Sequence, residues 1–167
     1  KQNVLKAVVI GCGSIGQRHI KNLKSIGIKS IYALRTKKGF HQDLPDDLGV
    51  IELNNWNDIA KEKPDIAIIS NPTSLHLETA LKLIPFVKGV LMEKPLSNSL
   101  EGVDRLIKLL NKNNTVLFMG HNLMFHPIIS NIKEFINSNN VGNIINIQCQ
   151  VGHWLPDWHP YENYKKS

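Results

Sequence analysis

Three glycines near the start of the chain have a spacing that can bind a phosphate group. Gly11, Gly13 and Gly16 form the pattern G-x-G-x-x-G between an apolar run and a segment of helical periodicity. There the first glycine permits a tight turn, the second lets the backbone approach a pyrophosphate, and the third lets helix pack on strand. The helix N-terminus, at Ser14 and Ile15, presents N–H groups to the phosphates. The alternative is a glycine-rich turn without a ligand.

A second candidate cofactor contact lies at the end of the next predicted strand. Dinucleotide-binding units usually carry an acid about 20 residues after the glycines, where it binds the ribose 2′-hydroxyl. Here Arg35 and Thr36 occupy this place, and the first acid of the chain is Asp43. Arg and Thr can bind a 2′-phosphate, which favours NADP, with NAD as the alternative cofactor. The alternative interpretation is that Arg35 stacks on the adenine ring and that Lys37 and Lys38 lie in a solvated loop.

The third candidate is a lysine in Glu93-Lys94-Pro95, which follows a predicted buried strand. Ligands of open α/β sheets bind at the carboxyl ends of the strands. An ammonium group there can hold a substrate oxygen or pass a proton while a hydride moves. The alternative is that Lys94 is an ordinary loop residue.

Short apolar runs and amphipathic segments alternate along the chain and position these residues. The pattern predicts strands near residues 4–10, 29–34, 50–53, 65–70, 89–92 and 115–119. It predicts helices over 14–26, 58–62 and 73–84, and a fourth that opens at 98–101 with a Ser or Asn cap and Glu101. This alternation predicts an α/β fold, a doubly wound parallel sheet of the Rossmann type.

After Gly120 the pattern changes, which predicts a second domain. Pro127 fits the first turn of a helix that extends to about Asn137. Apolar and polar residues alternate over 145–151, which is typical of a strand with one covered face. We therefore assign residues 1–120 to a cofactor-binding domain. Residues 121–167 are expected to be the first helix and strand of an α+β domain.

The charges are unevenly distributed along the chain. Residues 1–42 hold nine Lys or Arg and no acid, whereas residues 43–167 hold eleven basic and fourteen acidic side chains. A positive first quarter favours an anionic partner, and a phosphate-bearing cofactor, nucleic acid or plain solvent are the candidates. No aromatic stripe interleaves the lysines, and no zinc-finger or RNA-binding signature is present, so we expect no nucleic-acid partner.

The apolar runs are far shorter than the roughly 20 residues that span a membrane, so no membrane partner is expected. Cys12 and Cys149 make no disulfide framework. A cytoplasmic chain fits both observations best.

Four segments together resemble the Gfo/Idh/MocA (glucose–fructose oxidoreductase / inositol dehydrogenase) family: GCGSIGQRH at 11–19, NPTSLH at 71–76, MEKPLS at 92–97 and GHNLMFHP at 120–127. The resemblance implies that Lys94 is the active-site lysine and that Glu93 lies in the cofactor pocket. It also implies that Asn71, Pro72 and His76 lie along the cofactor. His121 and Asn122 become candidate substrate contacts.

The sequence departs from the family pattern in two respects. Met124 stands where the family commonly has Arg, so one polar contact on the substrate side is in question. Family members are also about twice as long, and their second domain supplies an Asp…His motif that works with the lysine. The chain is therefore expected to hold the cofactor domain and the start of a substrate domain, and to be inactive alone.

The last segment, 153–164, is similar to one in family members associated with bacterial surface sugars. Its rings suit sugar C–H surfaces, and His153, Asp157 and His159 suit hydroxyl groups. The alternative is a loop that covers a partner subunit. The same three side chains could suggest a metal, but no second ligand cluster supports one, so we expect none.

The resemblance therefore implies an NAD(P)-dependent oxidoreductase that transfers a hydride to or from a sugar, sugar derivative or sugar nucleotide. It implies a homo-oligomer at full length. The alternatives within the family are a nicotinamide-binding sensor or repressor, and a redox-assisted glycosidase or lyase with tightly held cofactor.

Overall fold

The computed structural model describes residues 4–36, 44, 46–138, 142–152 and 154. The chain divides into two units, residues 1–122 and 123–167. The division falls two residues after the boundary predicted from the sequence.

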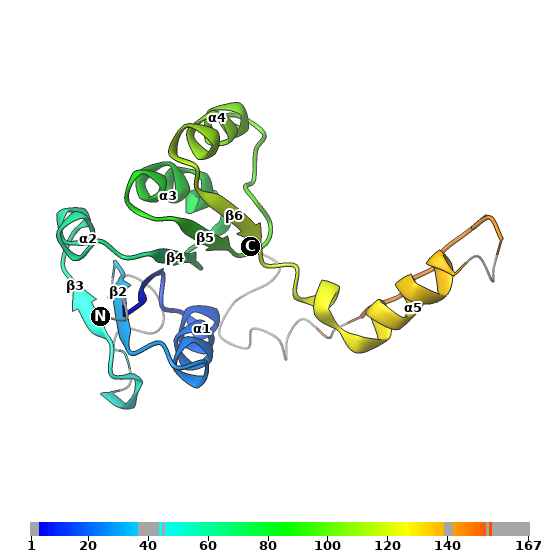
Figure 1. Ribbon diagram of the computed structural model, residues 1–167, viewed down its shortest axis with the longest axis horizontal. Helices are drawn as coiled ribbons and strands as arrows, with labels where there is room; N and C mark the ends of the chain where they lie inside the picture. The colour runs from blue at the N-terminus through cyan, green and yellow to red at the C-terminus, as the bar shows by residue number, and fades with distance from the viewer. Residues whose placement is uncertain (1–3, 37–43, 45, 139–141, 153, 155–167) are drawn as a thin grey trace. The chain divides into compact units, whose positions relative to one another are not determined.

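The first unit is built on a parallel sheet of six strands in the order β3-β2-β1-β4-β5-β6 (Figure 1). The strands are β1 Lys6–Ile10, β2 Ser30–Leu34, β3 Ile51–Leu53, β4 Ile66–Ile69, β5 Gly89–Met92 and β6 Val116–Met119. The strand order reverses between β1 and β4, and ligands of such sheets bind in the crevice at this point. The predicted doubly wound Rossmann sheet is thus confirmed.

Helices cover both faces of the sheet because the central strands are apolar on both sides. The helices are α1 Ser14–Ser25, α2 Trp56–Glu62, α3 His76–Leu83 and α4 Val103–Asn113. Ile59, Leu83 and Leu106 pack from α2, α3 and α4 onto one face. Ile20 and Leu23 pack from α1 onto the other. Figure 1 shows α3 and α4 on one side of the sheet and α1 on the other.

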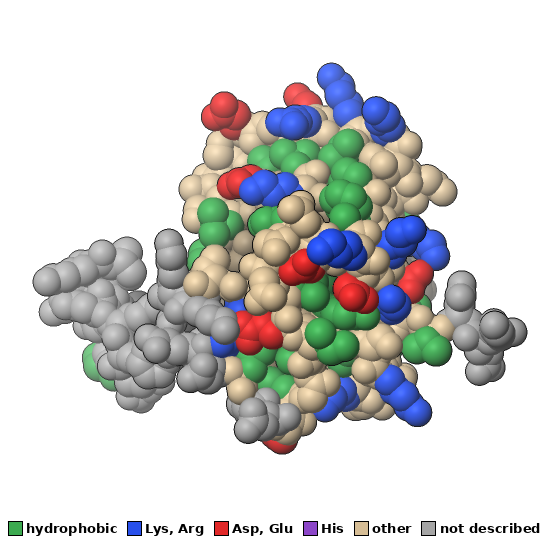
Figure 2. All heavy atoms as spheres, turned by 90° about the vertical axis from the view of Figure 1, so that its left-hand side faces the viewer, with side chains coloured by type: hydrophobic (Ala, Val, Ile, Leu, Met, Phe, Trp, Pro, Cys, Tyr) green, Lys and Arg blue, Asp and Glu red, His purple; other side chains and the backbone are tan. Residues whose placement is uncertain are grey.

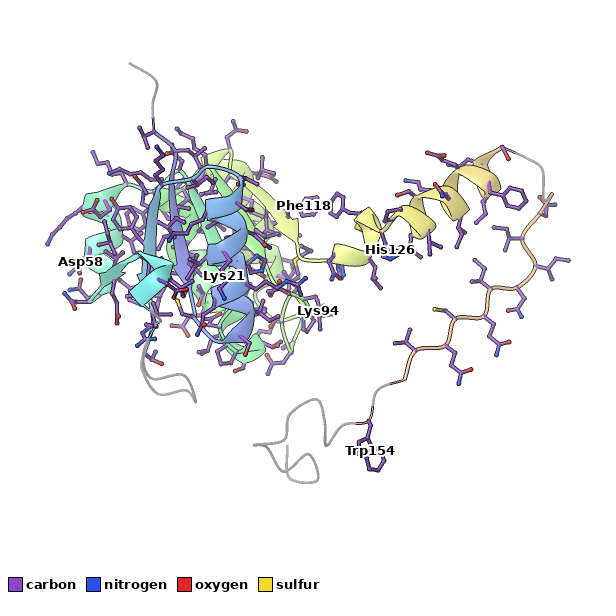
Figure 3. All side chains as sticks on the ribbon, turned by 90° about the horizontal axis from the view of Figure 1, so that it is seen from below. Lys21, Asp58, Lys94, Phe118, His126 and Trp154 are labelled. Carbon is purple, nitrogen blue, oxygen red and sulfur yellow. The ribbon has the colours of Figure 1, made fainter. Side chains whose placement is uncertain are left out.

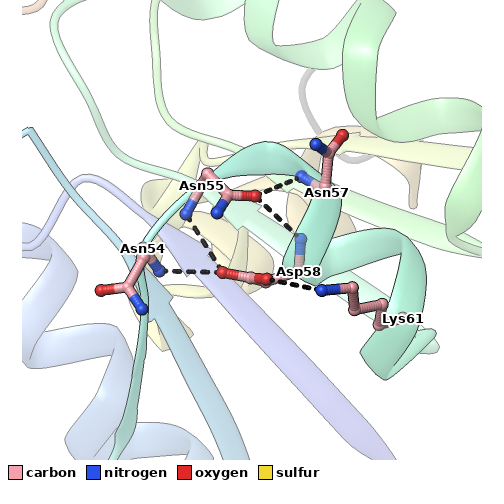
Figure 4. Close-up of polar contacts among 5 residues, drawn as sticks. All are labelled: Asn54, Asn55, Asn57, Asp58 and Lys61. Atoms are coloured by element: carbon pink, nitrogen blue, oxygen red, sulfur yellow. Dashed lines mark hydrogen bonds and ion pairs between the residues drawn. The ribbon is translucent and has the colours of Figure 1, made fainter.

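The turn before α2 is fixed by a capping box (Figure 4). The Asn55 side chain accepts hydrogen bonds from the backbone N–H groups of Asn57 and Asp58. The Asp58 carboxylate accepts in return from the N–H of Asn55 at 3.3 Å. Such reciprocal caps satisfy the first N–H groups of a helix. Helix α2 therefore begins at Trp56, two residues before the predicted start.

Helix α4 begins later than the sequence predicts. The Ser99 hydroxyl accepts from the N–H of Glu101, two residues on, rather than from a residue of the first helical turn. Gly102 then turns the chain at φ +83°, a conformation that favours glycine. The helix starts at Val103, and Leu100, predicted on its apolar face, is 86% exposed.

In the described part of the second unit, helix α5 Pro127–Asn137 follows a 3₁₀ turn at Asn122–Phe125. Pro127 occupies the first turn as predicted, and the His126 ring caps the helix by accepting from the N–H of Ile128. The alternating segment 145–151 forms no strand, which corrects that prediction. A strand needs a partner for its backbone groups, and none of the six strands in the described part of the chain pairs with it.

Two surface properties bear on partners. No helix in the described ranges is long and apolar enough to cross a membrane. On the face shown in Figure 2, basic and acidic side chains are interspersed rather than gathered by sign.

Candidate active site

The glycine turn after β1 is closed by backbone contacts that leave no room for side chains. Gly11 has φ +84°, and a Cβ there would lie 2.5 Å from the backbone nitrogen of Asn71. A Cβ on Gly16 would lie 2.1 Å from the carbonyl oxygen of Gly11. The first and third glycines therefore close the loop onto the end of β4 and onto helix α1.

Gly13 has a different environment, since a Cβ there would meet no heavy atom within 4 Å. Gly13 caps α1 without a side-chain hydrogen bond, and the first turn of the helix holds no acid. Ser14 and Ile15 are exposed beside it. The first N–H groups of a helix have no partner inside the helix and attract anions. The open cradle at Gly13 and these groups fit a pyrophosphate.

Ser70, at the end of β4, is a loop contact that the sequence analysis missed. Its hydroxyl donates to the carbonyl oxygen of Gly11 at 2.7 Å. The oxygen atom also lies 3.0 Å from the position that a Cβ on Gly16 would take. The glycine turn is thus bonded to the neighbouring strand. Position alone could have indicated Ser70, because it ends the predicted strand over 65–70 and ligands of such sheets bind at the carboxyl ends of strands.

Arg35, predicted to bind a 2′-phosphate, is largely enclosed. Its side chain is 5% exposed, and Nε lies 3.3 Å from a carboxylate oxygen of Glu52 on β3. Burial raises the pKa of the nearby Cys12 thiol to about 11, while the charge of Arg35 lowers it in part. Arg35 lies close to the glycine turn, because the N–H of Gly11 donates to the carbonyl oxygen of the preceding Leu34 at 3.0 Å. Thr36 is exposed beside it; Lys37 and Lys38 lie outside the described residues.

An acid, Glu52, lies beside Arg35, although the second strand itself carries none. It lies on the third strand and reaches the site across the sheet, opposite Ala33 in the strand register. Glu52 lies 17 residues after Arg35 in the sequence, beyond the acid-free stretch before Asp43.

Lys94 is exposed in the loop after β5 and is labelled in Figure 3. Glu93, the residue before Lys94, contacts helix α1. His19 Nε2 lies 2.8 Å from Glu93 Oε1, with the two side chains 17% and 21% exposed. A Cβ on Gly120, after β6, would lie 3.2 Å from the Glu93 carboxylate. In the sequence His19 belongs to the segment 11–19 that carries the family resemblance, and no contact was predicted for it.

Pro95, the residue after Lys94, contacts helix α3. His76 is 1% exposed. Its Nδ1 lies 2.8 Å from the carbonyl oxygen of Pro95, and its Nε2 lies 2.8 Å from that of Asn71. The imidazole thus lies buried between the two loops, with one ring nitrogen against each.

Asn71 and Pro72 lie at the carboxyl end of β4, next to the glycine turn. The Asn71 side-chain nitrogen donates to the Thr79 hydroxyl at 2.8 Å. Its oxygen Oδ1 is buried without a hydrogen-bond partner among the described residues. Pro72 is exposed at the start of the following turn.

Of the candidate substrate contacts, the structure places two. His121 and Asn122 are exposed directly after β6. The N–H of Gly120 bonds to the carbonyl oxygen of Met92, so this loop follows on beside that of Lys94. His153, Asp157 and His159 lie outside the described residues. Within the described ranges, no group of three or more His, Cys, Asp or Glu could hold a metal ion.

The parallel strands β1, β4 and β5 are neighbours, and their carboxyl ends bring three loops together. These loops carry the phosphate cradle at Gly13, the Asn71–Pro72 turn, and Lys94. Arg35 adds a cation at the end of β2. The arrangement can hold an anionic, extended cofactor and present an ammonium group two strands away from its phosphates.

Comparison with known proteins supports the NAD-binding fold. The model of the GFO_IDH_MocA family, described as an oxidoreductase family with an NAD-binding Rossmann fold, matches residues 5–121. Myo-inositol 2-dehydrogenase of Thermotoga maritima is 31% identical over 137 residues, which are 80% of this chain and 41% of that protein. The NADP(+) scyllo-inositol 2-dehydrogenase IolW of Bacillus subtilis is 26% identical, over 94% of this chain and 44% of that protein.

Among solved structures, a probable dehydrogenase from Thermotoga maritima has a TM-score of 0.72 and 28% identity. The match covers 83% of this chain and 42% of that one. The chain therefore spans less than half the length of these relatives. Since the family model matches most of the chain, the chain belongs to the Gfo/Idh/MocA oxidoreductase family through its NAD-binding Rossmann fold.

Proposed function

We propose that the protein is an NAD(P)-dependent dehydrogenase or reductase that transfers a hydride between nicotinamide and a hydroxyl-bearing carbon of a sugar, sugar nucleotide or cyclic polyol. The observation that carries this proposal is the place of Lys94. It follows β5, two strands from the phosphate cradle that follows β1. Neighbouring strands are about 4.8 Å apart, so the separation is about 10 Å. A nicotinamide riboside attached to the pyrophosphate can span that distance.

Lys94 would act on the substrate oxygen. In the oxidation direction the neutral amine of Lys94 would accept the hydroxyl proton and become an ammonium group, and in the reduction direction the ammonium group would return a proton to the new alkoxide. The bound nicotinamide supplies the hydride chemistry. The other residues of the site orient the reactants: the helix α1 N-terminus binds phosphate, and the loop at Asn71 lies between the cradle and Lys94.

NADP is the proposed preferred cofactor, because Arg35 and Thr36 stand at the end of β2. Glu52 limits this preference, since its carboxylate already neutralises part of the Arg35 charge at 3.3 Å. The curated relatives include one scyllo-inositol 2-dehydrogenase named for NAD(+) and one named for NADP(+), each 26% identical. The choice therefore rests on these local contacts.

The remaining features of the function are proposed from the family relation and the sequence. The substrate class follows the sugar and inositol names of the relatives. A role in surface-polysaccharide metabolism depends on the segment 153–164. We further propose a cytoplasmic homo-oligomer that binds no nucleic acid, with a cofactor domain at 1–120 and the start of a substrate domain at 121–167.

The test uses the whole protein with NAD⁺ or NADP⁺ and a panel of myo-inositol, scyllo-inositol, glucose, glucose 6-phosphate and UDP-N-acetylglucosamine. We expect absorbance at 340 nm to rise with at least one of them, and the rise to be lost in Lys94→Ala. Tight binding of NADPH without turnover on the whole panel would contradict the enzyme proposal and favour a sensor. Equal turnover in Lys94→Ala would contradict the role of the lysine.

A further inference from the structure

Lys94 lies between two residues that are each anchored to a different helix. Glu93 is bonded to His19 of α1 at 2.8 Å, and its backbone N–H continues the ladder to the Ile69 carbonyl at 2.9 Å. Pro95 is bonded to His76 of α3 at 2.8 Å. Helices α1 and α3 pack on opposite faces of the sheet. The lysine backbone is therefore fixed from both faces.

The anchors continue into the glycine turn. His76 also bonds to the carbonyl oxygen of Asn71 at 2.8 Å. The preceding residue, Ser70, donates to the Gly11 carbonyl at 2.7 Å. Gly11 leads back through the turn into α1, which carries His19. The contacts thus form a closed circuit that includes the phosphate cradle and the lysine loop.

Glu93 is poorly placed to be a cofactor contact, although the family resemblance implies one. Its carboxylate faces His19 on one side and lies 3.2 Å from where a Gly120 Cβ would be on another. It is 21% exposed. A carboxylate so enclosed needs a hydrogen-bonding partner, and His19 supplies it. A side chain at position 120 would displace it.

We propose that His19 and Glu93 are a positioning pair, which fixes Lys94 relative to the phosphate cradle on helix α1. This inference rests on the proposed role of Lys94. Removing the pair should leave phosphate binding at α1 intact but let the lysine loop shift. A misplacement of about 1 Å can lower the rate of the chemical step about 10²-fold.

The experiment uses the whole protein and three variants of the pair. His19→Leu removes the donor, Glu93→Gln removes the charge, and His19→Gln keeps an amide N–H near the place of Nε2. The matched control is Lys88→Met, which breaks the 2.8 Å ion pair with Asp65 at the opposite end of β5. The readouts are kcat, the Kd of NADPH, the midpoint of thermal unfolding, and protection of Lys94 from an amine-acylating reagent by saturating NADPH, followed by peptide mass spectrometry.

We expect His19→Leu to lower kcat about 10–10²-fold, to leave the Kd of NADPH nearly unchanged, and to lose most of the protection of Lys94. His19→Gln should restore a large part of kcat and of the protection of Lys94. Lys88→Met should change only the unfolding midpoint. The protection readout does not depend on turnover.

Three results would overturn the inference. A purely structural pair would lower the unfolding midpoint of His19→Leu, as in Lys88→Met, with kcat and protection unchanged. A direct cofactor contact by Glu93 would raise the Kd of NADPH in Glu93→Gln and not in His19→Leu. Failure of His19→Gln to restore kcat would also argue against it. If Lys94→Ala itself keeps full kcat, the proposed function has failed instead.

Discussion

The guanidinium of Arg35 and the carboxylate of Glu52 lie 3.3 Å apart, Nε to Oε1, and join the end of β2 to the neighbouring strand β3. The Glu52 side chain is 33% exposed, whereas that of Arg35 is enclosed. A phosphate that approaches Arg35 therefore meets the Glu52 charge as well. The pair combines a cation that attracts a 2′-phosphate with an anion that repels it and can accept from a 2′-hydroxyl.

This pair leads to a prediction about cofactor preference. We expect NADPH to bind more tightly than NADH, and Glu52→Gln to widen the difference by about tenfold, the effect of about 1.4 kcal/mol. The reason is that the amide no longer offsets the Arg35 charge. Arg35→Ala should remove the preference. Calorimetric titration of each variant with both cofactors measures the change.

The same titrations at two salt concentrations provide the control, because a charge–phosphate contact near the surface weakens as salt increases. NADH affinity should change less with salt than NADPH affinity. A preference for NADH that persists in Arg35→Ala would show that Arg35 does not select the cofactor.

The two glycines Gly13 and Gly16 should respond differently to alanine. A Cβ at position 16 would lie 2.1 Å from the Gly11 carbonyl. Gly16→Ala should therefore destabilise the fold by about 1–3 kcal/mol through overpacking. Gly13 has φ −67°, which alanine adopts, and no heavy atom within 4 Å of its Cβ position. Gly13→Ala should fold normally yet bind NADPH at least about tenfold more weakly.

Chemical denaturation and cofactor titration of both variants test this contrast. Gly27→Ala serves as a backbone control, since Gly27 has φ +88°, which strains alanine, and follows the C-terminal end of α1, away from the glycine turn. It should lose stability without a change in cofactor affinity. Normal NADPH binding by Gly13→Ala would mean that no phosphate approaches this position.

The sheet and the main helices could be predicted because their signals are local. The buried strand over 65–70 and the glycine pattern at 11–16 each have a periodicity that the sequence displays directly. The start of α4 could not, because it depends on the turn at Gly102, whose φ of +83° the Ser and Asn before it do not indicate. The strand predicted over 145–151 does not form, because a strand depends on a pairing partner and no local pattern supplies one.

The candidate site likewise has residues that the sequence could predict and contacts that it could not. Positions that belong to one loop, such as Gly13 and Lys94, could be proposed from their motifs. The contacts of Ser70, His19 and Glu52 join residues distant in sequence, so only the folded chain shows them. The predicted cofactor contact His76 instead lies under the loops, because its two ring nitrogens face carbonyl oxygens there.

Cys12 should make stability fall in alkaline solution. Burial raises the pKa of its thiol to about 11, whereas the pKa in an unfolded chain is about 8.5. The neutral thiol is thus favoured in the fold. Its contribution is complete below about pH 8.5 and is lost as the pH rises toward 11, a decrease of at most about 3 kcal/mol. Urea unfolding from pH 7 to 10.5 measures it.

Cys12→Ala is the control for this prediction, since it removes the thiol and keeps a small buried side chain. Its stability should fall less steeply over the same pH interval. Alkylation by iodoacetamide at pH 8 should also be much slower at Cys12 in the folded chain than in urea. Rapid alkylation of Cys12 in the native protein would contradict the buried, neutral thiol.

Lys94→Ala in the whole protein should lower kcat about 10²–10⁴-fold, the usual effect of removing a positioned acid–base group. The Kd of NADPH should change little, because the backbone at Gly13 and the N-terminus of α1 provide the phosphate contacts. Lys94→Arg keeps the charge but does not readily release a proton, so its kcat should stay low.

The control is Lys21→Ala, which removes an exposed lysine from α1, labelled beside Lys94 in Figure 3. It should retain normal kcat. Steady-state kinetics of all three variants, with Kd measured by titration, separates binding from chemistry. A Lys94→Ala enzyme with normal kcat, or one whose only defect is weaker NADPH binding, would remove Lys94 from the proton transfer and leave it a cofactor contact.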